Sequence, residues 1–384
     1  IEEGIEVAKL LVEYGYDALD TDVGSYDSWW WSHPPMYQKK GLYRPFAELM
    51  KKTVDVPVIC AGRMDDPDMA LEALENGETD MISLGRPLLA DPDYVNKLRS
   101  GRVSEIRPCI SCHEGCMGRI QEYSMLNCAV NPQACRERAN ALNPVRIPKK
   151  VMIIGGGVAG CEAARVLALR GHMPSLYEKG SRLGGNLLPG GAPDFKEDDI
   201  ALADWFTTML EKLRVPVYLN TEASADDIRK SGADAVILAT GSVPKVFSLG
   251  ADEHVYTAAQ VLMKEKDAGD TAVVIGGGLV GCETALWLAQ QGKNVKIVEA
   301  LDSILAVNGP LCHANSEMLE KLIPFNGIEV ITSAKASGYD GRVLTVSTAE
   351  GEKKLECDSV ILSVGYSENN SLYHEIEFDI PELY

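Results

Sequence analysis

Hydrophobic and polar positions in the first 100 residues follow a helical period and a strand period in turn. Apolar residues three or four apart predict helices, and short apolar runs flanked by turn residues predict strands. The predicted helices cover residues 1–14, a stretch from Pro45 and residues 67–76, and the predicted strands cover residues 18–22, 56–61 and 81–84. Helices and strands that alternate in this order form a parallel sheet.

The three strand–helix units predict either a small open sheet or the last part of a (β/α)8 barrel, because a complete barrel needs about 250 residues. The chain has no starting Met, and Ile1 already lies within an amphipathic helix. This favours the second alternative, in which the N-terminus is truncated.

Further along the chain the pattern changes to a complete dinucleotide-binding unit. A strand at 151–154 runs into the glycines Gly155, Gly157 and Gly160, and a helix and a second strand follow, ending at Glu178. The glycines allow a tight turn and close approach of a pyrophosphate to a helix N-terminus, and the acidic residue binds ribose hydroxyls. The alternative for Glu178 is an ordinary surface carboxylate.

The same unit occurs a second time. A strand at 272–275 enters the glycines Gly276, Gly278 and Gly281, and the next strand ends at Glu299. A repeat of this kind predicts two bound dinucleotides, one of them in a domain nested within the other. Glu299 can accept from a free 2′-hydroxyl and would repel a 2′-phosphate, which favours NADH over NADPH.

Between and beside these motifs lie further candidates. Arg182, followed by a glycine pair, and Gly241, after the predicted strand 235–238, are expected to complete the first dinucleotide site. The charged runs at 194–199 and 226–230 are interpreted as solvated faces.

Composition narrows the class of ligand. The chain has 384 residues, of which 46% are hydrophobic and 24% charged, as expected of a globular protein with a core. Its net charge of -19 disfavours nucleic acid and anionic membrane surfaces as partners. No apolar run approaches the roughly 18 residues that span a bilayer, and no signal peptide is evident, so a cytoplasmic location and a small-molecule substrate are expected.

Ten cysteines are present, and four of them fall within one short segment between the two halves of the chain. These four are Cys109, Cys112, Cys116 and Cys128. Three thiols within eight residues and a fourth on a returning loop favour an iron–sulfur centre. Zinc is the alternative, but Cys128 has no close partner except Cys135, and disulfides do not suit the cytoplasm. His113 is expected to be a neighbour of the cluster rather than a ligand.

The other six cysteines are interpreted as small buried hydrophobic residues. They are Cys60, Cys135, Cys161, Cys282, Cys312 and Cys357.

Two predicted barrel strands end in Gly-Arg pairs, Gly62-Arg63 and Gly85-Arg86. Each pair alone reads as a turn with a solvated charge, but at the ends of successive strands they predict a phosphate site. The loop after the first strand carries Tyr26, Trp29–Trp31 and His33, which would offer stacking surface and proton donors on a catalytic face. The alternative is that the tryptophans pack against the next domain.

With both glycine motifs, both Gly-Arg pairs and the Cys-x2-Cys-x3-Cys-x11-Cys spacing in this order, the chain resembles the multidomain Old Yellow Enzyme-like flavoenzymes. These include 2,4-dienoyl-CoA reductase, 2-enoate reductases, bile-acid enoyl reductases and trimethylamine dehydrogenase. The stretch Asp20–Asp27 looks closest to the 2-enoate and bile-acid branch. The resemblance implies the C-terminal part of a (β/α)8 barrel, followed by an FAD-binding Rossmann-like domain with a nested NAD(P)-binding domain.

The resemblance also implies cofactors. FMN phosphate would lie at Gly62, Arg63, Gly85 and Arg86, a [4Fe–4S] cluster on Cys109, Cys112, Cys116 and Cys128, FAD at Gly155, Gly157, Gly160, Glu178, Arg182 and Gly241, and NADH at Gly276, Gly278, Gly281 and Glu299. Electrons would pass from NADH to FAD, the cluster, FMN and finally a C=C bond of an α,β-unsaturated acid, acyl-CoA or enone. Tyr26 stands where dienoyl-CoA reductases carry a catalytic His, and it is the expected proton donor.

The predicted domains are a partial barrel (1–105), an iron–sulfur segment (106–135), a linker (136–150), an FAD-binding domain (151–245), an NAD(P)-binding domain (246–366) and a return to the FAD domain (367–384) that stops before the usual Gly-Asp motif. Two other functions stay open: an amine dehydrogenase of the trimethylamine dehydrogenase type, and an electron-transfer module without its own substrate. A partial barrel with an exposed edge is prone to association, which leaves a homo-oligomer open.

Overall fold

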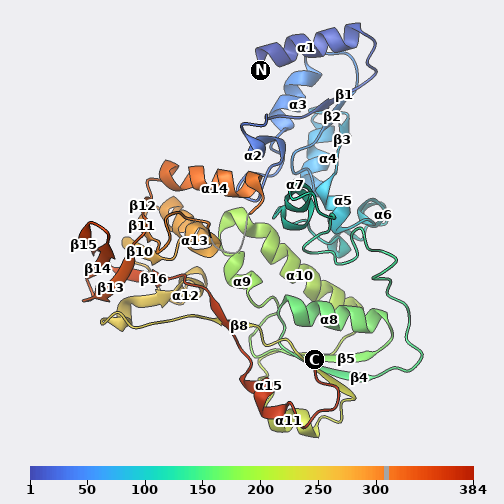
Figure 1. The fold of residues 1–384 in the computed structure, drawn as a ribbon. Helices are drawn as coiled ribbons and strands as arrows, with labels where there is room; N and C mark the ends of the chain where they lie inside the picture. The colour runs from blue at the N-terminus through green and yellow to red at the C-terminus, as the bar shows by residue number, and fades with distance from the viewer. Residues whose placement is uncertain (307–310) are drawn as a thin grey trace. The chain divides into compact units, whose positions relative to one another are not determined.

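The computed structural model describes residues 1–306 and 311–384, and it divides into two compact units (Figure 1). The first unit contains residues 1–140 and 311–318, and the second contains residues 141–310 and 319–384. Residues 307–310, which fall within the predicted NAD(P)-binding range 246–366, lie outside the described residues.

The first unit is built on a three-stranded parallel sheet in the order β1-β2-β3. Leu19 of β1 pairs with Val58 of β2, and Ile59 of β2 pairs with Met81 of β3. The elements of this unit are α1 (Glu2–Glu13), β1 (Leu19–Thr21), α2 (Trp29–Ser32), α3 (Arg44–Lys51), β2 (Val58–Cys60), α4 (Pro67–Glu75), β3 (Met81–Ile82), α5 (Arg86–Ala90), α6 (Tyr94–Arg99), α7 (Arg119–Gln121) and the beginning of α14 (His313–Phe325). The three predicted strands and three predicted helices of residues 1–84 are therefore confirmed.

Alternation along β2 sets the core of this unit. Val58 and Cys60 are fully buried and pack with Tyr43, Ala47 and Ala73 from the neighbouring helices. Because successive strand residues point to opposite faces, burial of every second residue fixes the register of the sheet. Helix α4 begins where the sequence predicts, at Pro67, because the carboxylate of Asp66 accepts from the N–H groups of Asp68 and Met69 at 3.0 Å.

The second unit contains a four-stranded parallel sheet in the order β6-β5-β4-β7. The end of the chain runs parallel to β7: Val236 N–H donates to Glu382 O, and Tyr384 N–H donates to Val236 O, both at 2.9 Å. Its elements are β4 (Lys150–Ile154), α8 (Val158–Leu169), β5 (Met173–Tyr177), α9 (Leu187–Gly190), α10 (Glu197–Lys212), β6 (Val217–Tyr218), α11 (Ala225–Lys230), β7 (Ala235–Leu238) and α15 (Ser371–Ile376).

A five-stranded parallel sheet in the order β12-β11-β10-β16-β9 follows within the same unit. The antiparallel pair β8–β17 marks the points at which the chain leaves the first sheet and returns to it. The elements are β8 (Ser242–Pro244), β9 (Val255–Thr257), α12 (Ala258–Leu262), β10 (Thr271–Ile275), α13 (Leu279–Gln290), β11 (Asn294–Val298), β12 (Glu329–Ile331), β13 (Lys335–Tyr339), β14 (Val343–Thr348), β15 (Gly351–Glu356), β16 (Ser359–Leu362) and β17 (Tyr366–Glu368).

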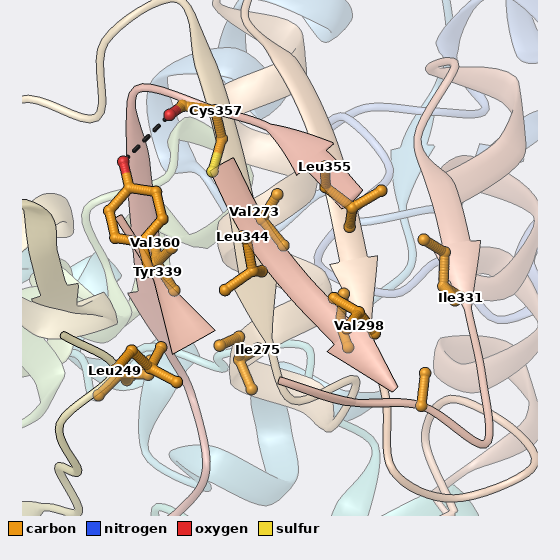
Figure 2. Packing of buried hydrophobic residues seen from close by; sticks show 13 residues of the cluster. Leu249, Val273, Ile275, Val298, Ile331, Tyr339, Leu344, Leu355, Cys357 and Val360 are labelled. Carbon is orange, nitrogen blue, oxygen red and sulfur yellow. Dashed lines mark hydrogen bonds between the residues drawn. The ribbon is translucent and has the colours of Figure 1, made fainter. Parts of the chain in front are cut away.

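The core of this nested half lies between the parallel sheet and the antiparallel meander β13-β14-β15 (Figure 2). Val273, Ile275 and Val360 from the sheet pack with Leu344 from the meander, and all four are buried. The hydroxyl of Tyr339 donates to the carbonyl of Cys357 at 3.0 Å, which satisfies a buried polar group at the rim of this core.

Two interpretations of the sequence are wrong at particular residues. The run at 194–199 is not a solvated face, because Asp198 and Asp199 in the first turn of α10 are buried. Cys135 is exposed, whereas Cys60, Cys161, Cys282, Cys312 and Cys357 are buried as predicted. The run at 226–230 does face solvent at its charged residues.

None of the helices in the described part of the chain is both long enough and apolar enough to span a bilayer.

Candidate functional site

The four clustered cysteines of the first unit line one small cavity of about 20 Å³. Cys128 reaches this cavity although it lies twelve residues after Cys116 in the sequence. Two left-handed residues, Ser111 and His113, turn the backbone between them, and a π-helical turn (Glu114–Gly118) carries Cys116. A side chain at Gly115 would bring a Cβ to 2.4 Å from Asn127 Oδ1, so glycine is required there. The N–H of Asn127 donates to Gly115 O at 2.7 Å, which returns the chain and delivers Cys128.

Burial raises the pKa of the Cys109 thiol to about 11 and that of Cys112 to about 12. Thiols in such surroundings stay neutral unless a cation compensates for the loss of hydration, and a bound metal deprotonates a coordinating thiol. Across residues 1–306 and 311–384, no three His, Cys, Asp or Glu side chains are close enough to share a single metal ion. Four thiols around a common cavity are nevertheless the donor set of an iron–sulfur cluster, so these residues fit that group.

Both Gly-Arg pairs line a second cavity in the same unit, of about 290 Å³. The predicted phosphate residues Gly62, Arg63, Gly85 and Arg86 are therefore brought together. Arg63 is buried and uses Nη1 for backbone carbonyls of the loop before α3, including Met36 O at 3.2 Å. Arg86 donates from Nη1 to Pro34 O at 2.9 Å, and no hydrogen bond to its Nε or Nη2 is found in the described part of the chain.

The two cavities share a wall, because Arg86 and Cys109 line both of them. His113, which is only 1% exposed, also lines the thiol cavity. Its Nε2 lies 2.7 Å from Arg86 Nη1, and its Nδ1 lies 2.6 Å from Asn315 Oδ1. Burial, together with Arg86, holds the pKa of His113 well below its usual value.

The aromatic residues of the loop after β1 lie partly in the larger cavity and partly in solvent. His33 lines the larger cavity, where burial and Arg86 lower its pKa, and its ring stacks on Trp29 at 5.4 Å. Tyr26 is 84% exposed, does not line this cavity, and meets Trp29 edge to face at 5.1 Å. Trp31 packs with the core of the first unit. The predicted proton donor Tyr26 is therefore not among the residues that line the cavity with the predicted phosphate residues.

In the second unit, both glycine turns have the same geometry. Gly155 and Gly276 have φ near +106° and +103°, and a Cβ on either would lie within 2.3 Å of a backbone oxygen of the crossing strand end. A Cβ at Gly160 or Gly281 would lie 1.9 Å from the carbonyl oxygen of Gly155 or Gly276. The third glycine of each motif is therefore needed to let helix α8 or α13 approach its own turn.

The helices of both motifs begin directly after a glycine. Gly157 and Gly278 are the N-cap residues of α8 and α13, and the Cβ position of Gly278 has no neighbour within 4 Å among the described residues. Unpaired N–H groups at a helix N-terminus attract anions.

Glu178 and Glu299 occupy equivalent places. Glu178 accepts from Gly156 N–H and Gly180 N–H, both at 2.6 Å, and Glu299 accepts from Gly277 N–H at 2.5 Å and Leu301 N–H at 2.7 Å. A carboxylate has about four lone-pair positions, so each can still accept from ribose hydroxyls. Glu178 differs from an ordinary solvated surface carboxylate, because one oxygen accepts from Gly156 of the glycine turn and the other from Gly180 in the loop after β5.

Two further candidates are less constrained. Gly241 follows β7 with φ of +68° in open space. Arg182 is half exposed and pairs with Asp204 at 2.8 Å.

A buried ion network joins the two dinucleotide-binding halves within the second unit. Lys196, at the start of α10, lies 2.9 Å from Glu283 of α13 and 3.6 Å from Asp199. Burial lowers the pKa of the Lys196 ammonium, but the two carboxylates outweigh this effect and raise it. Burial also raises the pKa of Asp199.

Comparison with known proteins assigns the family. The profile described as Pyridine nucleotide-disulphide oxidoreductase matches residues 149–382, and the profile of the NADH:flavin oxidoreductase / NADH oxidase family matches residues 1–105. A cinnamate reductase of Clostridium sporogenes is 54% identical over 99% of this chain. The chain belongs to the Old Yellow Enzyme-like NADH:flavin oxidoreductase family. Membership confirms the predicted fold class, with barrel strands in the first unit and FAD/NAD Rossmann domains in the second.

Other members of this Old Yellow Enzyme-like family match over the same span. A bilirubin reductase of Mediterraneibacter gnavus is 34% identical over 96% of the chain, and the solved complex of 2-naphthoyl-CoA reductase with 2-naphthoyl-CoA has a TM-score of 0.93 at 29% identity over 100% of the chain. The chain spans 57% of the cinnamate reductase, 58% of the bilirubin reductase and 59% of the 2-naphthoyl-CoA reductase chain.

Sequence reasoning missed two features of this Old Yellow Enzyme-like chain. The network of Lys196 and Glu283 carried a signal, because Glu283 is the one charged residue in the apolar helix 279–290 and needs a buried partner. The contact of His113 with Asn315 had no local signal, because 202 residues separate them.

Proposed function

We propose that this protein is an NADH-dependent ene-reductase that reduces the C=C bond of an α,β-unsaturated carboxylic acid. An aryl acid such as cinnamate is the first substrate to test, because the relative that is 54% identical is a cinnamate reductase. Acyl-CoA thioesters and enones are the wider class. The net reaction consumes one NADH and one proton and adds two hydrogens across the double bond.

One observation carries this proposal: Arg86 and Cys109 line both the thiol cavity and the larger cavity. A one-electron centre held by the thiols would adjoin a flavin whose phosphate is held by the Gly-Arg pairs. Such adjacency serves electron transfer and has no value for a purely structural metal.

Each group has its proposed residues. Cys109, Cys112, Cys116 and Cys128 would hold a [4Fe–4S] cluster, Gly62, Arg63, Gly85 and Arg86 the FMN phosphate, Gly155, Gly157, Gly160, Glu178, Arg182 and Gly241 the FAD, and Gly276, Gly278, Gly281 and Glu299 the NADH. When bound, these groups would supply hydride transfer from NADH, one-electron transfer through the cluster and reduction of the double bond.

The residues of this chain would bind the nicotinamide cofactor, orient the substrate and donate a proton to it. Glu299 selects NADH over NADPH, because its carboxylate repels a 2′-phosphate. The Tyr26 hydroxyl is the proposed proton donor to the substrate, and ordering of its exposed ring by bound substrate is part of that proposal. His33 and Trp29 offer the stacking surface beside it.

The predicted domain division, a cytoplasmic location and association into a homo-oligomer belong to the same proposal. An amine dehydrogenase is the alternative with relatives in the family, such as a dimethylamine dehydrogenase of Hyphomicrobium that is 28% identical. The second glycine motif with both oxygens of Glu299 in place favours NADH chemistry instead.

The test is an anaerobic NADH titration with iron, sulfide, FMN and FAD quantified and visible and EPR spectra recorded together. About four irons per chain, bleaching of FAD, a cluster signal and subsequent conversion of cinnamate to the saturated acid are expected. Zinc in place of iron, or a flavin that NADH leaves oxidised, overturns the proposal. Reduction by dimethylamine but not by NADH would support the amine dehydrogenase. Reduction by NADH with no acceptor among enoates would support the electron-transfer module.

A further inference from the structure

Arg86, His113 and Asn315 form a hydrogen-bond chain in the first unit. His113 and Asn315 are 1% and 4% exposed, and the distances are 2.7 Å from Arg86 Nη1 to His113 Nε2 and 2.6 Å from His113 Nδ1 to Asn315 Oδ1. The three residues come from α5, from the turn between Cys112 and Cys116, and from the first turns of α14.

The direction of each hydrogen bond in this series follows from the chemistry of Arg86. A guanidinium has five N–H donors and no acceptor, so Nε2 of His113 must accept from Arg86. The ring proton then lies on Nδ1, which donates to the amide oxygen of Asn315. His113 is thereby fixed in one tautomer, and the amide of Asn315 in one orientation.

The guanidinium of Arg86 donates hydrogen bonds to the protein from one nitrogen only. Nη1 donates to Pro34 O and to His113, while no described residue accepts from Nε or Nη2. Arg86 lines the cavity that also contains Gly62 and Gly85. A guanidinium edge with two parallel donors matches two oxygens of a phosphate.

We propose that His113 and Asn315 are positioning residues for Arg86, and that they tie phosphate binding in the larger cavity to the fold of the cysteine loop. His113 lines the thiol cavity while it holds the arginine of the phosphate cavity. Any change in the turn between Cys112 and Cys116 therefore moves the partner that orients Arg86. The inference rests on the proposed function, because the phosphate it refers to is that of FMN.

The test compares FMN with riboflavin, which has the same ring system and no phosphate. Purified protein that retains its iron and FAD is stripped of FMN, and binding of each ligand is followed by quenching of flavin fluorescence. The variants are His113→Phe, which keeps a planar ring without nitrogens, and Asn315→Leu, which removes the acceptor for Nδ1. Iron content and the EPR signal are recorded for each variant.

His113→Phe removes the hydrogen bond to the charged Arg86, so we expect an FMN dissociation constant at least about tenfold higher. Asn315→Leu removes the neutral bond that fixes the His113 tautomer, so a smaller rise is expected, with riboflavin binding unchanged in both variants. His113→Gln, whose amide oxygen can still accept from Arg86, should recover part of the affinity. The matched control is Gln121→Ala: it removes another contact of the same two segments, from His313 N–H to Gln121 Oε1 at 3.3 Å, without touching His113, and should bind FMN normally.

Unchanged FMN affinity in His113→Phe and Asn315→Leu overturns the positioning role while the proposed function stands. Equal weakening of FMN and riboflavin overturns it as well, because the effect would then not act on the phosphate. Failure of the wild-type protein to bind FMN overturns both the inference and the proposed function.

Discussion

Glu178 and Glu299 occupy the same position in the two copies of the dinucleotide-binding motif, so a substitution at one serves as the control for the same substitution at the other. Each carboxylate accepts from one backbone N–H group of its glycine turn and from one N–H group of the loop that follows the carboxylate itself. Replacing Glu299 with Ala leaves two N–H groups and the ribose hydroxyls without an acceptor, so we expect KM for NADH to rise at least about tenfold. The measurement is the rate of FAD reduction at varied NADH in a stopped-flow instrument.

The same change at Glu178 should act on the other dinucleotide. Glu178→Ala is expected to lower the FAD content of the purified protein, and to leave KM for NADH unchanged in the molecules that keep FAD. If both variants lose affinity for FAD and for NADH alike, the two carboxylates maintain the fold and do not define separate binding sites.

Tyr26 is a separate residue-level prediction, because the ring is 84% exposed and has no role in the core. Removal of a general acid slows a reaction by roughly 10²- to 10⁴-fold. Tyr26→Phe should therefore reduce cinnamate turnover by at least about a hundredfold, while NADH oxidation by an artificial acceptor and thermal stability stay unchanged. Cinnamate turnover at the wild-type rate would remove Tyr26 from the mechanism.

Residues whose chemistry is local in sequence could be predicted, and residues paired over long distances could not. The four cysteines and both glycine motifs were found because each lies within a short segment whose spacing reflects its geometry. Glu283 and Lys196 lie 87 residues apart, and Asn315 lies 202 residues from His113. Only tertiary packing brings such pairs together, so no spacing predicts the partner, although the single charge of Glu283 in an apolar helix indicates that a partner is needed.

At the scale of elements, Lys196 connects helices α10 and α13. Substituting Met for Lys196 would remove the ammonium that the buried carboxylates of Glu283 and Asp199 share, and breaking a buried pair in this way costs about 3–5 kcal/mol. We expect a lower free energy of unfolding by that amount in urea titrations of FAD-loaded protein. Lys196→Met with Glu283→Leu should recover much of the loss, because it removes one of the stranded charges.

A loss below about 1 kcal/mol in Lys196→Met would mean that water reaches the network and solvates the carboxylates. The single and double variants therefore distinguish a buried network from a hydrated one.

Helix α3 provides a pH-dependent prediction. Arg44 makes a two-pronged pair with Glu78, at 2.7 and 2.8 Å, and this hydrogen bonding lowers the pKa of Glu78 below its usual 4.5. A carboxyl group with a lowered folded-state pKa stabilises the fold above its unfolded pKa, and this contribution disappears as the pH falls through the folded-state value. Arg44→Met should thus cost about 1–2 kcal/mol at pH 7 and progressively less below about pH 4.5.

The control is Lys52→Met at the C-cap of the same helix, which removes an exposed pair with Glu48 at 2.6 Å and should cost less than about 0.5 kcal/mol at any pH. A deficit in Arg44→Met that stays constant between pH 7 and pH 4 would show that lost packing of the arginine stem, and not the ion pair, is responsible.

At the scale of the whole molecule, the order of helices and strands along the chain could be predicted from the sequence, but the division of the chain into two compact units could not. The strands and helices of the barrel part and both Rossmann motifs follow from periodicity, but the first unit also takes residues 311–318 from within the predicted NAD(P)-binding range. That segment has no distinctive composition. Its place depends on contacts such as that of His313 with Gln121, which joins residues 192 positions apart.

The two units should unfold as separate transitions, each responsive to its own ligand. Residues 1–140 with 311–318 contain the four thiols and Trp29–Trp31, whereas the other unit contains both glycine motifs, Trp205 and Trp287. A ligand that binds only the folded state stabilises the unit that holds it. Anaerobic removal of iron should lower the first melting temperature by about 2–4 °C for each kcal/mol of stability lost and leave the second unchanged, while excess FAD should raise only the second. Differential scanning calorimetry with flavin fluorescence in parallel measures both, and a single transition that shifts with either ligand would mean that the two units unfold cooperatively, since a ligand bound to either one would then stabilise both.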